Sequence, residues 1–161
     1  MSLKLPTSLA LITAIATAAS TAFAALTGSI TVSGSVPAAT AVVVTGVAGY
    51  NALDLTTSAT DLSVASVREI NNTTGGYTVT AASSNSGQLK NGSLGSVAYT
   101  AKYNGTSFSL SSTPVTVTTG AASNTVVNVV KSLQISYTGQ SAQNLMAGTY
   151  SDTLTFTIAA P

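Results

Sequence analysis

The side chains that could do chemistry in this 161-residue chain are few and of limited type. Histidine and cysteine are absent, so Ser-His and Cys-His nucleophile pairs cannot form from this chain alone. The imidazole and thiolate ligands of common metal sites are missing for the same reason. Carboxylate oxygens, which could bind a hard cation such as Ca²⁺, remain. The four carboxylates are Asp54, Asp61, Glu69 and Asp152.

None of these carboxylates stands in a spacing that such chemistry needs. Asp54 and Asp61 lie seven residues apart in a Thr-rich stretch without an Asp-x-Asp-x-Asp pattern, which favours solvated loop residues. Asp152 precedes the last predicted strand, where capping of a turn is expected. Arg68 and Glu69 should point to opposite faces of a strand and not pair, with either one facing inward. We therefore predict no catalytic residues, no cofactor, no metal and no enzymatic activity.

The charge balance limits the partners of the chain. Lys and Arg number five and Asp and Glu four, and removal of Lys4 with a signal peptide would leave zero formal charge. Nucleic-acid binding depends on clustered basic residues, so it is not expected. A weakly charged surface rich in Ser, Thr and Asn has little self-repulsion and tolerates association. Most of the six tyrosines are expected to pack in the core or on a sheet face.

The first 24 residues have the pattern of a secretory signal peptide. Lys4 precedes an apolar run from Leu9 to Ala19, and Ala22-Phe23-Ala24 provides a small-x-small cleavage site. The apolar run is shorter than the roughly 20 residues of a transmembrane helix. We therefore expect export, with a mature chain that begins at Ala25 and has no disulfide framework.

Nearly every segment after the signal favours strand over helix, because Thr, Val, Ser and Tyr dominate. Asn72 to Gly76 and Asn104-Gly105 are predicted turns, and residues 85–95 a loop. Residues 51–61 are predicted to form a short helix or an irregular crossing. This pattern favours one all-β domain of two packed antiparallel sheets. The predicted strands are 29–36, 41–45, 62–70, 77–82, 97–103, 115–118, 125–137 (as one strand or two) and 153–159.

Both ends of the mature chain alternate apolar and hydroxyl residues. Near the N-terminus the apolar positions are Leu26, Gly28, Ile30 and Val32. Near the C-terminus, Leu154, Phe156 and Ile158 share one strand face, and threonines occupy the other. The N-terminal strand has no nearby hairpin turn, so its partner must be a distant part of the chain or another molecule. The C-terminal pattern also fits an ordinary terminal strand.

The C-terminal stretch 147–158 resembles the last strand of chaperone–usher pilins, most closely the archaic group and spore coat protein U-like subunits. The stretches 71–80 and 97–105 resemble the same group. This resemblance implies an immunoglobulin-like antiparallel β-sandwich that is incomplete and is completed by a donor strand. The implied organisation is a signal peptide over 1–24, a donor strand over 25–36 and a pilin-like domain over 37–161.

The resemblance also implies the residues that make the contact. The donor strand would present Leu26, Gly28, Ile30 and Val32, with Gly28 either admitting close approach of another chain or marking a bulge. The acceptor groove is implied to include Gly148, Tyr150, Leu154, Phe156 and Ile158. Many subunits of these systems carry a disulfide, and this chain carries no cysteine, which leaves its subgroup open.

The implied function is that of a structural subunit of an extracellular fimbria that polymerises by donor-strand exchange. Its partners would be further copies of itself, a periplasmic chaperone and an outer-membrane usher. The fibre would support adhesion to a host or abiotic surface, or biofilm formation. A monomeric secreted β-sandwich that binds glycans is the alternative, and it predicts a closed sandwich with an aromatic and polar cluster on its loops.

Overall fold

The computed structural model describes residues 27–161, and these residues contain strands and turns but no helix. Accordingly, no helix of the described part is long and apolar enough to cross a membrane. Residues 36–161 form one compact unit. The predicted signal peptide and Leu26 lie outside the described residues.

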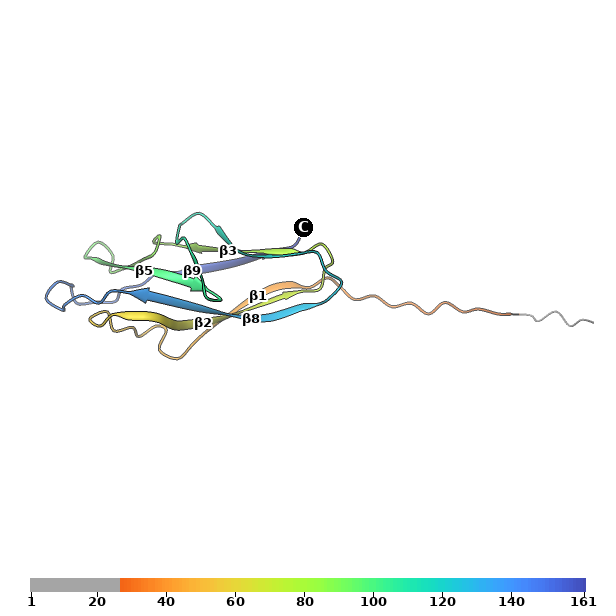
Figure 1. The fold of residues 1–161 in the computed structure, drawn as a ribbon, viewed down its shortest axis with the longest axis horizontal. Coiled ribbons are helices and arrows are strands. Elements are labelled where there is room, and N and C mark those ends of the chain that lie inside the picture. Colours follow the sequence, from red (N-terminus) through yellow and green to blue (C-terminus); the bar gives the residue numbers. More distant parts are fainter. Residues whose placement is uncertain (1–26) are drawn as a thin grey trace, which may run out of the picture. The chain divides into compact units, whose positions relative to one another are not determined.

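Within residues 27–161, nine strands form two antiparallel sheets, which are drawn in Figure 1. One sheet has the order β1-β2-β8-β5-β4, with β6 paired to β5, and the other has the order β7-β3-β9. The strands are β1 (Thr40–Gly46), β2 (Ala59–Asn71), β3 (Tyr77–Ser83), β4 (Gln88–Lys90), β5 (Ser96–Tyr103), β6 (Thr106–Phe108), β7 (Val115–Gly120), β8 (Val127–Tyr137) and β9 (Leu154–Ala159).

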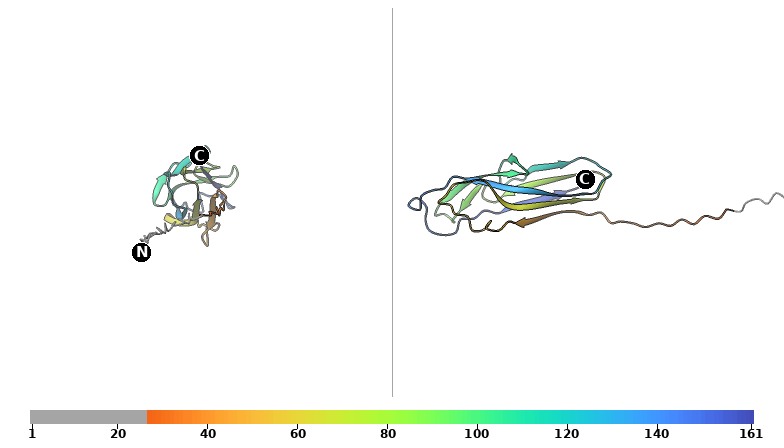
Figure 2. Two further views of the ribbon diagram at one scale, coloured as in Figure 1. Left: turned by 90° about the vertical axis from the view of Figure 1, so that its right-hand side faces the viewer. Right: turned by 60° about the horizontal axis from the view of Figure 1, so that its bottom comes forward.

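The core lies between the two sheets, because the strands of both alternate buried and exposed residues. In β3 the buried residues are Tyr77, Val79, Ala81 and Ser83, and in β5 they are Val97, Tyr99, Ala101 and Tyr103. The rings of Tyr103 and Phe156 stack across the two sheets with centroids 5.5 Å apart. The predicted all-β fold of antiparallel sheets is confirmed, and the arrangement is that of a β-sandwich (Figure 2).

Two predicted turns are confirmed by their backbone angles. Asn104 and Gly105 both have positive φ, as a two-residue hairpin requires, and they join β5 to β6. Gly76 has φ +87°, and a Cβ there would collide with the Gly120 carbonyl oxygen on the neighbouring strand. Residues 51–58 are irregular and not helical, which is one of the two predicted outcomes.

The structure corrects three predictions of secondary structure. Residues 29–36 form no strand, and residues 27–36 are all exposed. The predicted loop 85–95 contains β4, whose Leu89 is buried because it pairs with Val97. Asp61 lies within β2 rather than in a loop, at a register shift in the pairing of β2 with β8, with φ +51°.

Candidate functional site

One concave feature of the sandwich lies between β1 and β9. Among the described strands, β1 pairs only with β2 and β9 only with β3, so each of these strands is the last in its sheet. The two strands lie next to each other without sharing a ladder. Each therefore presents one edge of backbone N–H and C=O groups that no described strand pairs.

A mainly apolar groove of about 350 Å³ opens between the last residues of β1 and the first residues of β9. Its walls include Val44 and Gly46 of β1 and Leu154 and Phe156 of β9. Core residues form its floor, so the interior of the sandwich is reached directly through the groove. The floor residues are Val64, Ala65, Leu89, Tyr99, Leu133 and Ile135, and Tyr50, Leu53, Asp152 and Thr153 complete the lining.

The two neighbouring valines of β1 show how the strand faces the groove. Val44 lies opposite Val67, which is fully buried, and both side chains point inward. Val44 is nevertheless 48% exposed, because the groove beside it is open. Val43 is 47% exposed but belongs to the outer face, opposite Arg68. Apolar surface that points toward the core is therefore left uncovered at Val44.

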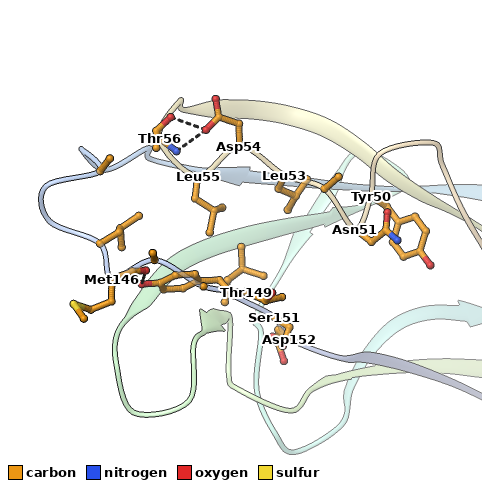
Figure 3. Close-up of a pocket in the computed structure, with 17 residues that line it drawn as sticks. Tyr50, Asn51, Leu53, Asp54, Leu55, Thr56, Met146, Thr149, Ser151 and Asp152 are labelled. Carbon is orange, nitrogen blue, oxygen red and sulfur yellow. Dashed lines mark hydrogen bonds between the residues drawn. The ribbon is translucent and has the colours of Figure 1, made fainter.

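A second cavity of about 620 Å³ continues the groove at the end where β9 begins. It lies between the loop that carries Tyr50 to Thr56 and the segment that precedes β9, as Figure 3 shows. Leu55 points from the loop toward this facing segment (Figure 3). Tyr50, Leu53, Leu89 and Asp152 line both spaces, so we treat the groove and this end cavity as one continuous site.

Asp152 fixes the place where the chain passes from one sheet to the other. Just before it, Ser151 exchanges two backbone hydrogen bonds with Lys90 of β4, and just after it β9 pairs with β3. The Asp152 carboxylate accepts hydrogen bonds from Ser83 Oγ at 2.5 Å, Tyr99 Oη at 2.7 Å and the Asn85 amide at 2.9 Å. Burial, and then this bond to Asp152, raises the pKa of Tyr99 well above its usual range. The Tyr99 hydroxyl therefore stays protonated as a donor.

The wall of the groove is supported from below by a buried carboxylate. Glu69 is fully buried, and it accepts hydrogen bonds from the hydroxyls of Tyr103 at 2.6 Å and Tyr77 at 2.9 Å. Tyr103 stacks on Phe156 of the groove wall. Arg68 points outward to Asn128, so Arg68 and Glu69 do not pair, as predicted.

The remaining carboxylates have structural partners. Asp54 accepts from the Thr56 hydroxyl and amide and from Thr57, and the Thr56 hydroxyl makes the largest contribution to lowering its pKa. Asp61 forms a 2.8 Å ion pair with Lys102, whose hydrogen bond lowers the Asp61 pKa. Residues 27–161 hold no group of three acidic, histidine or cysteine side chains that could bind a metal.

The structure brings together most of the predicted acceptor residues. Leu154 and Phe156 line the groove, and Gly148 and Tyr150 line the end cavity. Gly148 has φ +149°, a backbone conformation that residues with a side chain rarely adopt, and the Asn91 side-chain amide lies close to it. Ile158 packs against the core but lines neither space.

The predicted donor residues that the structure describes are exposed. Gly28, Ile30 and Val32 belong to the segment without secondary structure, and Ile30 and Val32 are each 88% exposed. We call residues 25–36 the arm. The contributions of β1, the Tyr50–Thr56 loop and Leu89 to the groove were not predicted. The continuous apolar run of β1 hides its alternation, and the loop and Leu89 are placed by tertiary pairing.

No protein-family model matches the chain, and a search of curated proteins finds no similar sequence.

Proposed function

We propose that this chain is a structural subunit of an extracellular fimbria and polymerises by donor-strand exchange. In this proposal the sandwich is immunoglobulin-like and incomplete, and the arm of a second copy enters the groove between β1 and β9. The observation that carries the proposal is the combination of an apolar groove flanked by two unpaired strand edges with an arm that alternates apolar residues and whose described residues, 27–36, are exposed and unpaired.

The physical gain from insertion is twofold. An inserted strand would pair with the free edges of β1 and β9, so its backbone groups and theirs would be hydrogen-bonded. Ile30 and Val32 would pass from 88% exposure into an apolar groove. Each large side chain so buried contributes about 1.5–3 kcal/mol before the cost of ordering the arm. Because the free groove leaves the apolar side chain of Val44 48% exposed, a periplasmic chaperone would cover it before assembly and an usher would direct the exchange.

The test is assembly of the mature chain, residues 25–161, followed by negative-stain microscopy. Ile30→Asp should abolish fibres, because it places a charge in the apolar groove. Thr31→Asp is the matched control, since successive side chains of a strand point to opposite faces and Thr31 would face away from the groove. Loss of fibres in both variants, or in neither, would contradict insertion of the arm in this register.

If fibres form only with a chaperone, the groove can still be tested alone, by binding a peptide of residues 25–36 to the chain that lacks its arm. A groove that binds the arm peptide in the absence of fibres supports an acceptor that requires assisted assembly. Absence of peptide binding would contradict the proposal.

One observation favours a glycan-binding module as a second candidate. The end cavity has the rings of Tyr50 and Tyr150 beside Asn51, Asp54 and Thr149, which is a mixture of stacking and polar groups on loops. This candidate predicts that the chain without residues 25–35 is a stable monomer that binds a glycan. Loss of that binding in Tyr50→Ala, with the fold intact, would support it.

A further inference from the structure

The chain entering β1 is tied to the turn that follows β2. Asn72 Oδ1 accepts a hydrogen bond from the Ala39 amide at 2.6 Å, and Asn72 Nδ2 donates to the Pro37 carbonyl at 2.9 Å. The Asn72 amide also donates to the Ala39 carbonyl at 3.0 Å. The side chain and the backbone N–H of Asn72 thus bind both ends of the segment Pro37 to Ala39. Pro37 is the first residue of the chain that these hydrogen bonds fix.

The neighbouring Asn71 makes this attachment rigid. Asn71 is 2% exposed, and its Oδ1 accepts hydrogen bonds from Thr40 Oγ1 and Thr73 Oγ1, each at 2.9 Å. Its Nδ2 donates to the Thr73 carbonyl at 3.1 Å. The turn that carries Asn72 is therefore itself fixed to the start of β1.

The directions of β1 and β9 decide how a strand can lie between them. β1 begins beside Asn72, and Pro161, just after β9, packs against Gly75 three residues further along the same turn. β1 therefore starts at the end of the sandwich where β9 finishes, as Figures 1 and 2 show. The two strands run in opposite directions.

These directions distinguish a chain's own arm from that of a second copy. To enter its own groove, the arm would have to reverse before β1 and would run antiparallel to β1 and parallel to β9. Because Pro37 to Ala39 are held, the reversal would be confined to residues 33–36. Pro37 also restricts Val36 to extended conformations, which shortens the usable turn further. The arm of a second copy has no such constraint and can enter in either direction, with one antiparallel and one parallel neighbour in each case.

We propose that Asn72 is a positioning residue that keeps the arm out of its own groove, so that the groove remains available for a second copy. This inference rests on the proposed function, because it concerns which molecule supplies the inserted strand. Asn72 would act on the ratio of closed monomer to polymer rather than on the groove itself.

The experiment measures closed monomer in the mature chain, residues 25–161, refolded at low concentration. Monomer and polymer are separated by size exclusion, and amide hydrogen exchange of residues 28–32 reports whether the arm of the monomer is paired. Asn72→Ala removes two side-chain hydrogen bonds from the segment, so the ratio of protected to unprotected arm in the monomer should rise about tenfold. Asn128→Ala, which removes the hydrogen bond to Arg68 on the outer face, should leave the ratio unchanged.

A second variant reaches the same result without altering the domain. Insertion of Gly-Ser-Gly-Ser between Ser35 and Val36 lengthens the free turn, so it should also increase the protected monomer. If Asn72→Ala fails to fold, the insertion variant by itself tests whether a longer free turn increases the closed monomer. Wild-type polymerisation with no rise in protected monomer in either variant overturns the inference and leaves the proposed function standing. A wild-type chain that neither polymerises nor binds the arm peptide overturns both.

Discussion

At the scale of the residue, Glu69 connects the buried core to the wall of the groove. An ionised carboxylate without partners is very costly to bury, but both oxygens of Glu69 accept a tyrosine hydroxyl. Among residues 27–161, no buried side-chain nitrogen or oxygen lacks a partner. Because Tyr103 also stacks on Phe156, removal of this carboxylate would loosen the wall that an incoming strand must meet.

The Tyr77–Glu69 hydrogen bond predicts a loss of stability in alkali. Burial, and then the bond to Glu69, raises the pKa of Tyr77 from 10.0 to about 12. The folded state therefore holds the phenolic proton more tightly than the unfolded state does. The resulting stabilisation is complete below pH 10 and is lost as the pH rises from 10 to about 12. One such tyrosine contributes a slope of up to about 1.4 kcal/mol per pH unit.

Urea unfolding followed between pH 7 and pH 12 tests this expectation. Tyr77→Phe should lower the free energy of unfolding at pH 7 by about 1–3 kcal/mol, because Glu69 loses a donor. The same variant should show a shallower decline above pH 10. Tyr50→Phe is the control at pH 7, where it should change little because Tyr50 is 54% exposed and donates no hydrogen bond to the core. An unchanged alkaline slope in Tyr77→Phe would contradict the argument.

At the scale of the element, β1 offers a matched pair of positions on opposite faces. Val43 and Val44 have nearly equal exposure, at 47% and 48%, but only Val44 lines the groove. Val44→Asp should weaken binding of a peptide spanning residues 25–36 at least tenfold, since it places a charge beside the inserted strand. Val43→Asp should weaken it less than twofold. The two affinities can be compared by fluorescence anisotropy of a labelled peptide, and equal effects would exclude the groove as the binding site.

The local sequence pattern predicted seven of the strands, but it did not predict for every strand which side chains face the core. The β-branched alternation of residues 77–82 and 97–103 is strong enough to locate β3 and β5. In β2 the register shifts between Ser63 and Ala65, so Val64 and Ala65 are both buried and the inward parity changes. After that shift Val67, Glu69 and Asn71 face inward. An alternation counted from Leu62 would instead have placed Arg68 inside, so the sequence could not choose between Arg68 and Glu69.

The remaining differences arise where pairing partners decide the structure. β4 and β6 have three residues each and exist because β5 pairs with them. The arm has the alternation of a strand, yet its described residues, 27–36, form none in this single chain, because a strand needs a partner for its backbone hydrogen bonds. The C-terminal alternation identified Leu154 and Phe156, whereas Val44 and Leu53 join the groove only through the packing of the two sheets.

At the scale of the whole molecule, assembly would depend on apolar contacts and backbone pairing rather than on charge. Residues 25–36 contain no charged side chain, and the groove has a single carboxylate, Asp152, which is already bound by Ser83, Tyr99 and Asn85. Screening by salt acts mainly on exposed charges. The affinity of the groove for the arm peptide should therefore change less than about twofold between 50 mM and 500 mM NaCl. A steep decline with salt would indicate a charged interface elsewhere.

The last prediction concerns the chain that lacks its arm. Residues 37–161 would retain the open groove, and any strand that binds it stabilises the folded state by mass action. A peptide spanning residues 25–36, at about 100 times its dissociation constant, should add about 2.7 kcal/mol to the free energy of unfolding. The same peptide with Ile30→Asp should add almost nothing, and the peptide with Thr31→Asp should behave like the unmodified one. Thermal unfolding at several peptide concentrations measures all three. A midpoint that rises with the unmodified and Thr31→Asp peptides but not with the Ile30→Asp peptide identifies an acceptor site that contacts one face of the arm. A midpoint of unfolding that stays unchanged with all three peptides shows that the groove does not bind this strand, because binding to the folded state would raise the midpoint.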